Sequence, residues 1–209
     1  MLNQKTLDDL WNFSDPAASE EHFRQALTST EYDDGERAEL ATQLGRAIGL
    51  QGRYEEADMY LDSIEGAEED PTIGVRILLE RGRVLNSSGQ AAMAVPLFEQ
   101  AAELGDHLGE EFLAVDALHM LAIADAEHCE LWTRSAIEYA STVTDQQTKR
   151  WLIVLHNNLG WHLSDGKEFT KALVEFQLAE QWAQRLGTPK QQELAAAAVA
   201  QCAEAVDHA

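Results

Sequence analysis

Residues 44–61 read LGRAIGLQGRYEEADMYL, and residues 81–98 (RGRVLNSSGQAAMAVPLF) and 159–176 (LGWHLSDGKEFTKALVEF) repeat the same spacing. In each stretch a glycine is followed twelve positions later by alanine, and four positions after that by a large apolar residue. The matching residues are Gly45, Ala57 and Leu61; Gly82, Ala94 and Phe98; and Gly160, Ala172 and Phe176. Self-similarity at a period of about 20–50 residues indicates a solenoid of stacked units, here pairs of helices.

The chain has 209 residues, of which 45% are hydrophobic and 7% aromatic, so it has ample material for a folded core. Its 37 acidic and 15 basic side chains give a net charge of −22. This charge repels phosphate backbones and anionic lipids, which disfavours binding to nucleic acid and to membranes. Two interpretations stay open: the acidity attracts a basic partner, or it only keeps the surface soluble.

The two cysteines, Cys129 and Cys202, have no metal-ligand spacing and are expected to be free thiols in a reducing compartment. The sequence begins without the basic and apolar segments of a signal peptide, and no apolar run approaches the roughly 20 residues that a bilayer requires. We therefore expect a cytoplasmic protein.

Apolar residues recur at helical spacing along the chain, and nothing resembles a strand. The expected helices span 5–13, 16–29, 35–50, 53–64, 71–87, 90–105, 109–126, 130–142, 145–164, 167–186 and 189–206. We predict an all-α single domain of antiparallel helix pairs over 1–209. Its units are 1–30, 35–66, 71–106, 109–143 and 145–187, and the helix over 189–206 is a C-terminal cap.

Proline and glycine mark the ends of these helices. The prolines that follow a capping residue, as at the first position of a helix, are Pro16, Pro71 and Pro189. The glycines expected at turns with positive φ between paired helices are Gly52, Gly89 and Gly166. Pro96 lies inside an expected helix and should bend it, because it removes a backbone hydrogen bond.

The repeated stretches resemble the tetratricopeptide repeat family, whose pattern is W-x2-L-G-x2-Y followed by A-x3-F. The Leu-Gly pair is present at 44–45 and 159–160, whereas Arg81 replaces the leucine in the second copy. A weaker copy runs through Leu121, Thr133, Ile137 and Ala140. The interval between neighbouring copies exceeds the roughly 34 residues of the standard repeat. Such units resemble the elongated repeats of bacterial peptide-sensing regulators and kinesin light chains.

The resemblance implies a right-handed superhelix whose first helices line a concave groove that holds a peptide or helix of a partner. Side chains around each Leu-Gly position would then face the partner. These candidate binding residues are Thr42, Arg46, Arg76, Leu79, Arg83, Asn86, His119, Asn157, Asn158 and Trp161.

Arg46 and Arg83 occupy equivalent places in successive units. One interpretation is a site for a carboxylate or an acidic segment, because guanidinium groups bind carboxylates in a bidentate manner. The other is that they neutralise nearby glutamates such as Glu39, Glu56 or Glu80. The carboxylate clamp with which some family members bind heat-shock chaperones is matched only at Asn158 and Arg83.

Asn157 and Asn158 carry amides that can hold the backbone of a peptide, and Trp161 is suited to anchor a partner. The alternative for Trp161 is packing against a neighbouring helix. His156 and His162 are six residues apart and do not share a helical face, and no HExxH, phosphate-binding or nucleophile motif is present. We expect no metal, no cofactor and no catalytic activity.

The first functional prediction is an adaptor or scaffold that binds a peptide or helix of another protein in its groove. A regulatory sensor of a small signalling peptide or metabolite is the second. A structural module that self-associates weakly into homo-oligomers is the third.

Overall fold

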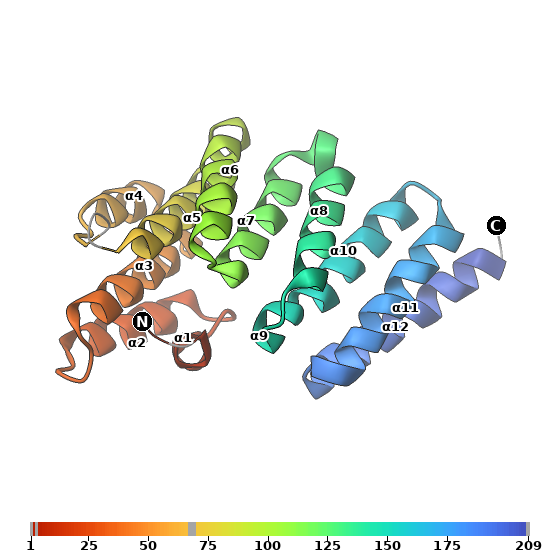
Figure 1. Ribbon diagram of the computed structural model, residues 1–209, viewed down its shortest axis with the longest axis horizontal. Coiled ribbons are helices and arrows are strands. Elements are labelled where there is room, and N and C mark those ends of the chain that lie inside the picture. Colours follow the sequence, from red (N-terminus) through yellow and green to blue (C-terminus); the bar gives the residue numbers. More distant parts are fainter. Residues whose placement is uncertain (1, 3, 67–69, 208–209) are drawn as a thin grey trace. The chain divides into compact units, whose positions relative to one another are not determined.

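The structure, a computed structural model, describes residues 2, 4–66 and 70–207 (Figure 1). Within these ranges every regular element is a helix, which confirms the predicted all-α fold class. None of the helices in this part of the chain combines the length and apolar character needed to cross a bilayer.

The chain divides into two compact units, Met1–Asp125 and Ala126–Ala209. The boundary falls inside the predicted unit 109–143, so the two helices expected to pair there belong to different compact units. The continuous superhelix, which would span both, stays a prediction.

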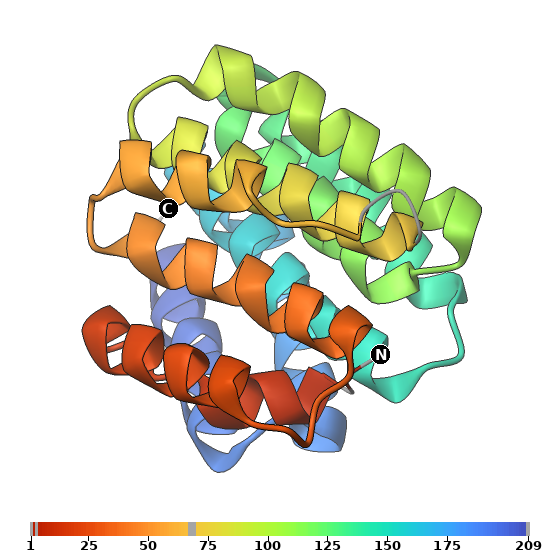
Figure 2. The ribbon, with the colours of Figure 1, turned by 90° about the vertical axis from the view of Figure 1, so that its left-hand side faces the viewer.

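The first compact unit is a series of helices in which each element packs on the next. The helices are α1 (Gln4–Leu10), α2 (Pro16–Thr28), α3 (Asp34–Leu50), α4 (Tyr54–Asp62), α5 (Pro71–Ser87), α6 (Ala91–Leu108) and α7 (Glu111–Ala124). Besides these sequential contacts, α5 packs on both α3 and α7. The helices from α2 to α6 lie side by side in Figure 2. This is the contact pattern of stacked helix pairs, with α3, α5 and α7 as neighbouring first helices.

The second compact unit repeats this arrangement on a smaller scale. It comprises the 3₁₀ turn η1 (Ala126–His128) and the helices α8 (Cys129–Thr142), α9 (Gln146–Lys149), α10 (Trp151–Asp165), α11 (Phe169–Leu186) and α12 (Pro189–Asp207). Helix α10 contacts α8, α11 and α12, and α12 also packs along α11.

The repeated glycines lie where the paired helices approach most closely, as their spacing predicts. A Cβ atom added to Gly82 would be 2.5 Å from Cε1 of Phe98, and one added to Gly160 would be 2.6 Å from Cε1 of Phe176. In the first copy the same atom on Gly45 would be 2.5 Å from Cδ2 of Leu61. Because atoms in contact normally stay about 3.5–4 Å apart, only glycine leaves room for these side chains.

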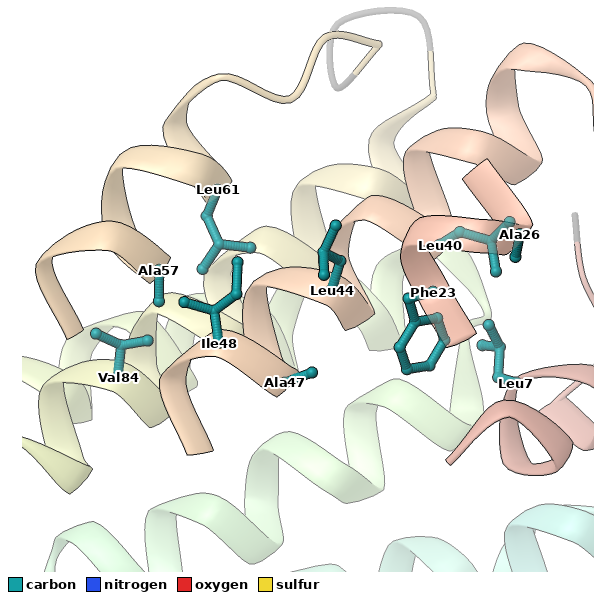
Figure 3. Packing of buried hydrophobic residues seen from close by; sticks show 10 residues of the cluster. All are labelled: Leu7, Phe23, Ala26, Leu40, Leu44, Ala47, Ile48, Ala57, Leu61 and Val84. Atoms are coloured by element: carbon teal, nitrogen blue, oxygen red, sulfur yellow. The ribbon is translucent and has the colours of Figure 1, made fainter. Parts of the chain in front are cut away.

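The repeated large residues are the centres of the cores. Phe98, Phe176 and Leu61 are each 0% exposed. Figure 3 shows Leu61 pointing from α4 toward α3, with Leu44 and Ile48 beneath it. Ala57, one turn before Leu61, is also fully buried, so the small residue of the second helix lets the pair close.

The predicted proline starts are confirmed. Asp15 accepts a hydrogen bond from the backbone N–H of Ala18, and Asp70 accepts one from Thr72. At α12, the Thr188 hydroxyl accepts from the N–H of Gln191. Each contact satisfies one of the backbone donors that a helix leaves free at its N-terminus.

The turn glycines follow the prediction at two of three places. Gly52 and Gly89 have φ of 77° and 83°. Gly166, however, has φ of −75°, and the positive φ falls on Lys167, at 63°. The prediction for Gly166 is therefore wrong by one residue, because this turn places its left-handed position one step later. Helix α6 runs without interruption through Pro96.

Candidate functional site

The predicted binding residues lie on α3, α5 and α7 of the first compact unit and on α10 of the second. In the first unit, Thr42 and Leu79 are 0% and 1% exposed. The Thr42 hydroxyl donates to the backbone carbonyl of Glu39. The expectation that these two side chains face a partner is therefore not met, because both point into the contact between helices.

Arg76 is also an internal residue. Its side chain is 8% exposed, and its Nε donates to Oε1 of Glu39 at 3.3 Å. Glu39 further accepts a hydrogen bond of 2.6 Å from the backbone N–H of Leu2. Burial raises the pKa of Glu39, although the charge of Arg76 opposes this shift. This pair joins α3 to α5 and does not offer a free cation to a ligand.

Arg83 forms one ion pair within α5, with Glu80, and one that joins α5 to α7, with Asp116. Its Nη1 lies 2.9 Å from Oε1 of Glu80, and its Nη2 lies 2.5 Å from Oδ1 of Asp116. Burial by itself would raise the pKa of Asp116, but the positive charges of Arg83 and Arg46 outweigh it and hold the pKa below its usual value. The donors of Arg83 are thus occupied within the protein.

Arg46 has a different environment. Its guanidinium lies 5.3 Å from the ring centroid of Trp11 and 5.4 Å from that of Phe13, within cation–π range. Its Nε is 3.9 Å from Oε2 of Glu80, and neither of these buried atoms has a hydrogen-bond partner among the described residues. Burial and the nearby charge of Arg83 lower the pKa of Arg46.

These contacts favour the neutralising interpretation of the two arginines. Glu80 lies between Arg46 and Arg83, and Glu39 is paired with Arg76. Glu56, the other carboxylate considered, pairs instead with Arg53.

Residues near the N-terminus cover the α3 part of the predicted binding surface, which α3, α5 and α7 were expected to form together. Leu2 reaches Glu39, the indole N–H of Trp11 donates to Oε1 of Gln43 at 3.1 Å, and Trp11 and Phe13 flank Arg46. Glu39, Gln43 and Arg46 are four and three residues apart and share one face of α3. The chain's own residues therefore occupy the place expected for a partner on this helix.

Two of the candidate binding residues on α5 and α7 remain partly exposed to solvent. Asn86 and His119 are half-buried. Burial lowers the pKa of His119, with the charge of Asp116 opposing the shift and that of Arg83 adding to it. Neither residue lines the three clefts whose lining residues include Ala38 and Tyr60, His22 and Tyr32, or Gln100 and His107.

In the second compact unit, all three candidate binding residues are at least partly exposed to solvent. Asn157 and Asn158 are half-buried on α10, and Trp161 is 37% exposed. Trp161 also packs edge-to-face on Phe176, with ring centroids 4.9 Å apart. Both interpretations of Trp161 are thus compatible with its position, because one edge packs on the core while part of the ring faces solvent.

A cleft lies between α10 and α12 beside Asn157. Its volume is about 140 Å³, and its lining residues are Ile153, Val154, Asn157, Gln191, Leu194 and Ala195. Four of these six are apolar, and Leu194 is 56% exposed. The cleft thus offers an apolar floor with two side-chain amides.

Sequence reasoning identified Asn157 but missed the contribution of α12, which was assigned only a capping role. The available signal was Leu194, a large apolar residue among the alanines of 195–198. A larger hollow of about 630 Å³ in the first unit is lined by residues that include Asp34, Arg37 and Tyr60, and none of the predicted binding residues is among its lining residues.

Within the described ranges, no group of three or more His, Cys, Asp and Glu side chains could hold a metal ion. His156, one of the histidines considered for a metal, is buried and its Nδ1 lies 2.7 Å from Oε2 of Glu175.

No protein-family model matches the chain, and no curated protein matches it either. Among solved structures, the chain is similar to the one described as the crystal structure of BtubC (BKLC) from P. vanneervenii. The TM-score is 0.64 at 17% sequence identity, and the match covers 96% of this chain and 84% of that one. At this identity the likeness shows a shared all-helical fold and leaves the function to be inferred from the site.

Proposed function

We propose that this chain is a protein-interaction module that holds a short segment of a partner protein on the exposed face of α10. The observation that carries the proposal is the apolar cleft between α10 and α12, with Asn157 and Gln191 at its edge. An apolar pocket with a few polar groups is the usual form of a binding site, and a partly exposed tryptophan, here Trp161, is a frequent anchor at protein interfaces.

The size of the cleft supports a side chain of a partner over a metabolite. Pockets for small-molecule ligands usually measure about 300–1,000 Å³, whereas this cleft measures about 140 Å³. It has room for one apolar side chain, and the remainder of the partner segment would lie along the surface of α10. The adaptor is thus favoured over the metabolite sensor at this position.

The distribution of charge is also compatible with this location. Residues 1–125 contain 26 acidic and 8 basic side chains, whereas residues 126–209 contain 11 and 7. The acidic excess is therefore mainly a property of the first unit. A partner on α10 need not be strongly basic.

Peptides selected from a displayed library for binding to the full chain test this proposal. We expect Leu194→Arg to weaken the binding of the selected peptides at least tenfold in calorimetric titrations. Leu194 is 56% exposed, so this change should leave the fold intact, which circular dichroism would check. Val174→Arg on α11 is a matched control, because Val174 is 51% exposed and does not line the cleft.

If selected peptides bind equally well to both variants and to the unmodified chain, the partner site is elsewhere. Trp161→Phe keeps the packing on Phe176 but removes the rest of the indole. If this variant also binds the selected peptides as tightly as the unmodified chain does, Trp161 is not an anchor and α10 is not the binding site.

A further inference from the structure

A stripe of half-buried and exposed side chains runs along one face of α10 and the residue before it. Its members are Arg150, Val154, Asn157, Trp161 and Asp165. They are separated by four, three, four and four residues, the spacing that keeps side chains on one face of a helix. Arg150 has α-helical dihedrals, with φ of −61° and ψ of −22°, so it continues the helical path just before α10.

The two ends of this stripe carry opposite charges. Nη1 of Arg150 donates to Oε1 of Gln147 at 3.5 Å, the limit of a hydrogen bond, and Arg150 forms no ion pair with another described residue. Asp165 is exposed, and none of the ion pairs between described residues includes it. Neither charge is thus neutralised by an ion pair between described residues.

The middle of the stripe places two large side chains, Val154 and Trp161, on either side of the amide of Asn157. Val154 lines the cleft, Leu194 of α12 borders it, and Trp161 lies two turns beyond Val154. At about 1.5 Å per residue, the path from Arg150 to Asp165 spans about 22 Å. The stripe therefore presents a cation, a centre with these two large side chains, and an anion along one line.

Resting on the function proposed above, we infer that the partner segment is an amphipathic helix with three complementary features. It carries an acidic residue opposite Arg150, an apolar residue that enters the cleft, and a basic residue opposite Asp165. Opposite charges at the rim of an interface fix the register and orientation of a partner, while an apolar ridge that fills a groove between two helices is a common mode of helix recognition.

The charges also indicate a direction. Acidic side chains stabilise the N-terminal end of a helix and basic side chains the C-terminal end, because of the helix dipole. A partner helix with its acid first and its base last would match Arg150 and Asp165 when it runs parallel to α10. The opposite order matches the same charges only at a cost to the partner helix itself.

Synthetic helical peptides of about five turns, long enough to cover the stripe, test the inference on the full chain. The first peptide carries Glu in its first turn, Leu at its centre and Lys in its last turn, with the two charges spaced along the helix as Arg150 and Asp165 are. The second has the same composition with Glu and Lys exchanged, and the third has proline at its centre. Dissociation constants are measured by fluorescence anisotropy at low and at high salt.

We expect the first peptide to bind at least fivefold more tightly than the second, and this ratio to shrink at high salt because exposed charges are screened. In the double variant Arg150→Glu, Asp165→Lys the parallel orientation of the first peptide would bring like charges together at both ends, so its binding should weaken at low salt. The control double variant Arg185→Glu, Glu193→Lys, which exchanges charges away from the stripe, should keep the original preference.

Three results would overturn the inference. Equal binding of the first two peptides to every variant, with binding still lost in Leu194→Arg, refutes the charge assignment but leaves the proposed function standing. Unchanged binding of the proline peptide refutes the helical partner, because proline interrupts a helix. Failure of all three designed peptides to bind the unmodified chain, while library-selected peptides bind and lose affinity in Leu194→Arg, refutes this inference and leaves the proposed function standing.

Discussion

The close approach at Gly82 gives a quantitative test of how the helix pairs are held. In Gly82→Ala the new Cβ would lie 2.5 Å from the ring of Phe98, which is 0% exposed and has no free space into which to retreat. Relief requires a displacement of about 1 Å in a close-packed core. Overpacking of this kind typically costs about 1–3 kcal/mol.

A second glycine of the same helix provides the control. Gly74 also lies within α5, and a Cβ added there meets no heavy atom within 4 Å. Replacing glycine with alanine in a helix interior contributes about 1 kcal/mol of stability through the backbone. Gly74→Ala should therefore be stabilising, while Gly82→Ala should be destabilising by up to about 2 kcal/mol. Both substitutions gain the same helix propensity, so this gain cancels when the change in the free energy of unfolding of one variant is subtracted from that of the other. The remaining difference is the overpacking cost of about 1–3 kcal/mol.

Urea unfolding followed by far-ultraviolet circular dichroism measures both variants, with extrapolation to water. Trp11 is the only tryptophan in residues 1–125, but the other four would also contribute to fluorescence, so circular dichroism is the primary signal. In a double-mutant cycle, Phe98→Ala should remove the penalty of Gly82→Ala, because the cavity accepts the added methyl group. A difference below about 0.5 kcal/mol between Gly74→Ala and Gly82→Ala would refute the explanation of the repeated glycine.

Three further outcomes concern charge and backbone strain. Arg83→Met should destabilise the first unit by about 3–5 kcal/mol in urea unfolding, because it removes the only cation that hydrogen-bonds to the buried carboxylates of Glu80 and Asp116 among the described residues; a loss below about 1 kcal/mol would contradict this. The lowered pKa of folded Asp116 stabilises the fold above its unfolded pKa of about 3.9. This contribution is lost as the pH falls through the folded value, so the stability gap between the unmodified chain and Asp116→Asn should narrow below about pH 4, and a gap independent of pH would argue against the pair. Lys167→Gly should raise the melting temperature, because a left-handed backbone costs a non-glycine residue about 1–2 kcal/mol, whereas Lys167→Ala should leave the temperature nearly unchanged.

The helix pairs could be predicted because their signal is local. Gly82 and Phe98 lie on consecutive helices, and the interval between them, which recurs at Gly45–Leu61 and Gly160–Phe176, reports a direct contact within each pair. The starts of α2, α5 and α12 were likewise readable, since a capping residue followed by proline acts within one turn. The turn at 166–167 was misplaced by one residue because the prediction followed the glycine, whereas the left-handed residue lies seven positions after the repeated glycine in all three copies, at Gly52, Gly89 and Lys167.

The site was harder to predict because it depends on how separate helices are rotated toward one another. Arg83 pairs with Asp116, which lies two helices further along the chain, and helical periodicity does not identify which carboxylate of α7 faces α5. The coverage of Arg46 by Trp11 and Phe13 depends on the path of the segment between α1 and α2. Leu194 completes the cleft only because α12 packs beside α10.

The packing of one large side chain against a glycine in each helix pair has a consequence for which substitutions the chain can accept. It concentrates the requirements for closing each hairpin in a few positions, so the solvent-facing remainder is free to drift. Substitutions at the other surface positions should then leave the architecture of a helix pair intact. In this chain, the interval between a glycine and the large side chain that occupies its space is therefore the part of the sequence that most constrains each pair.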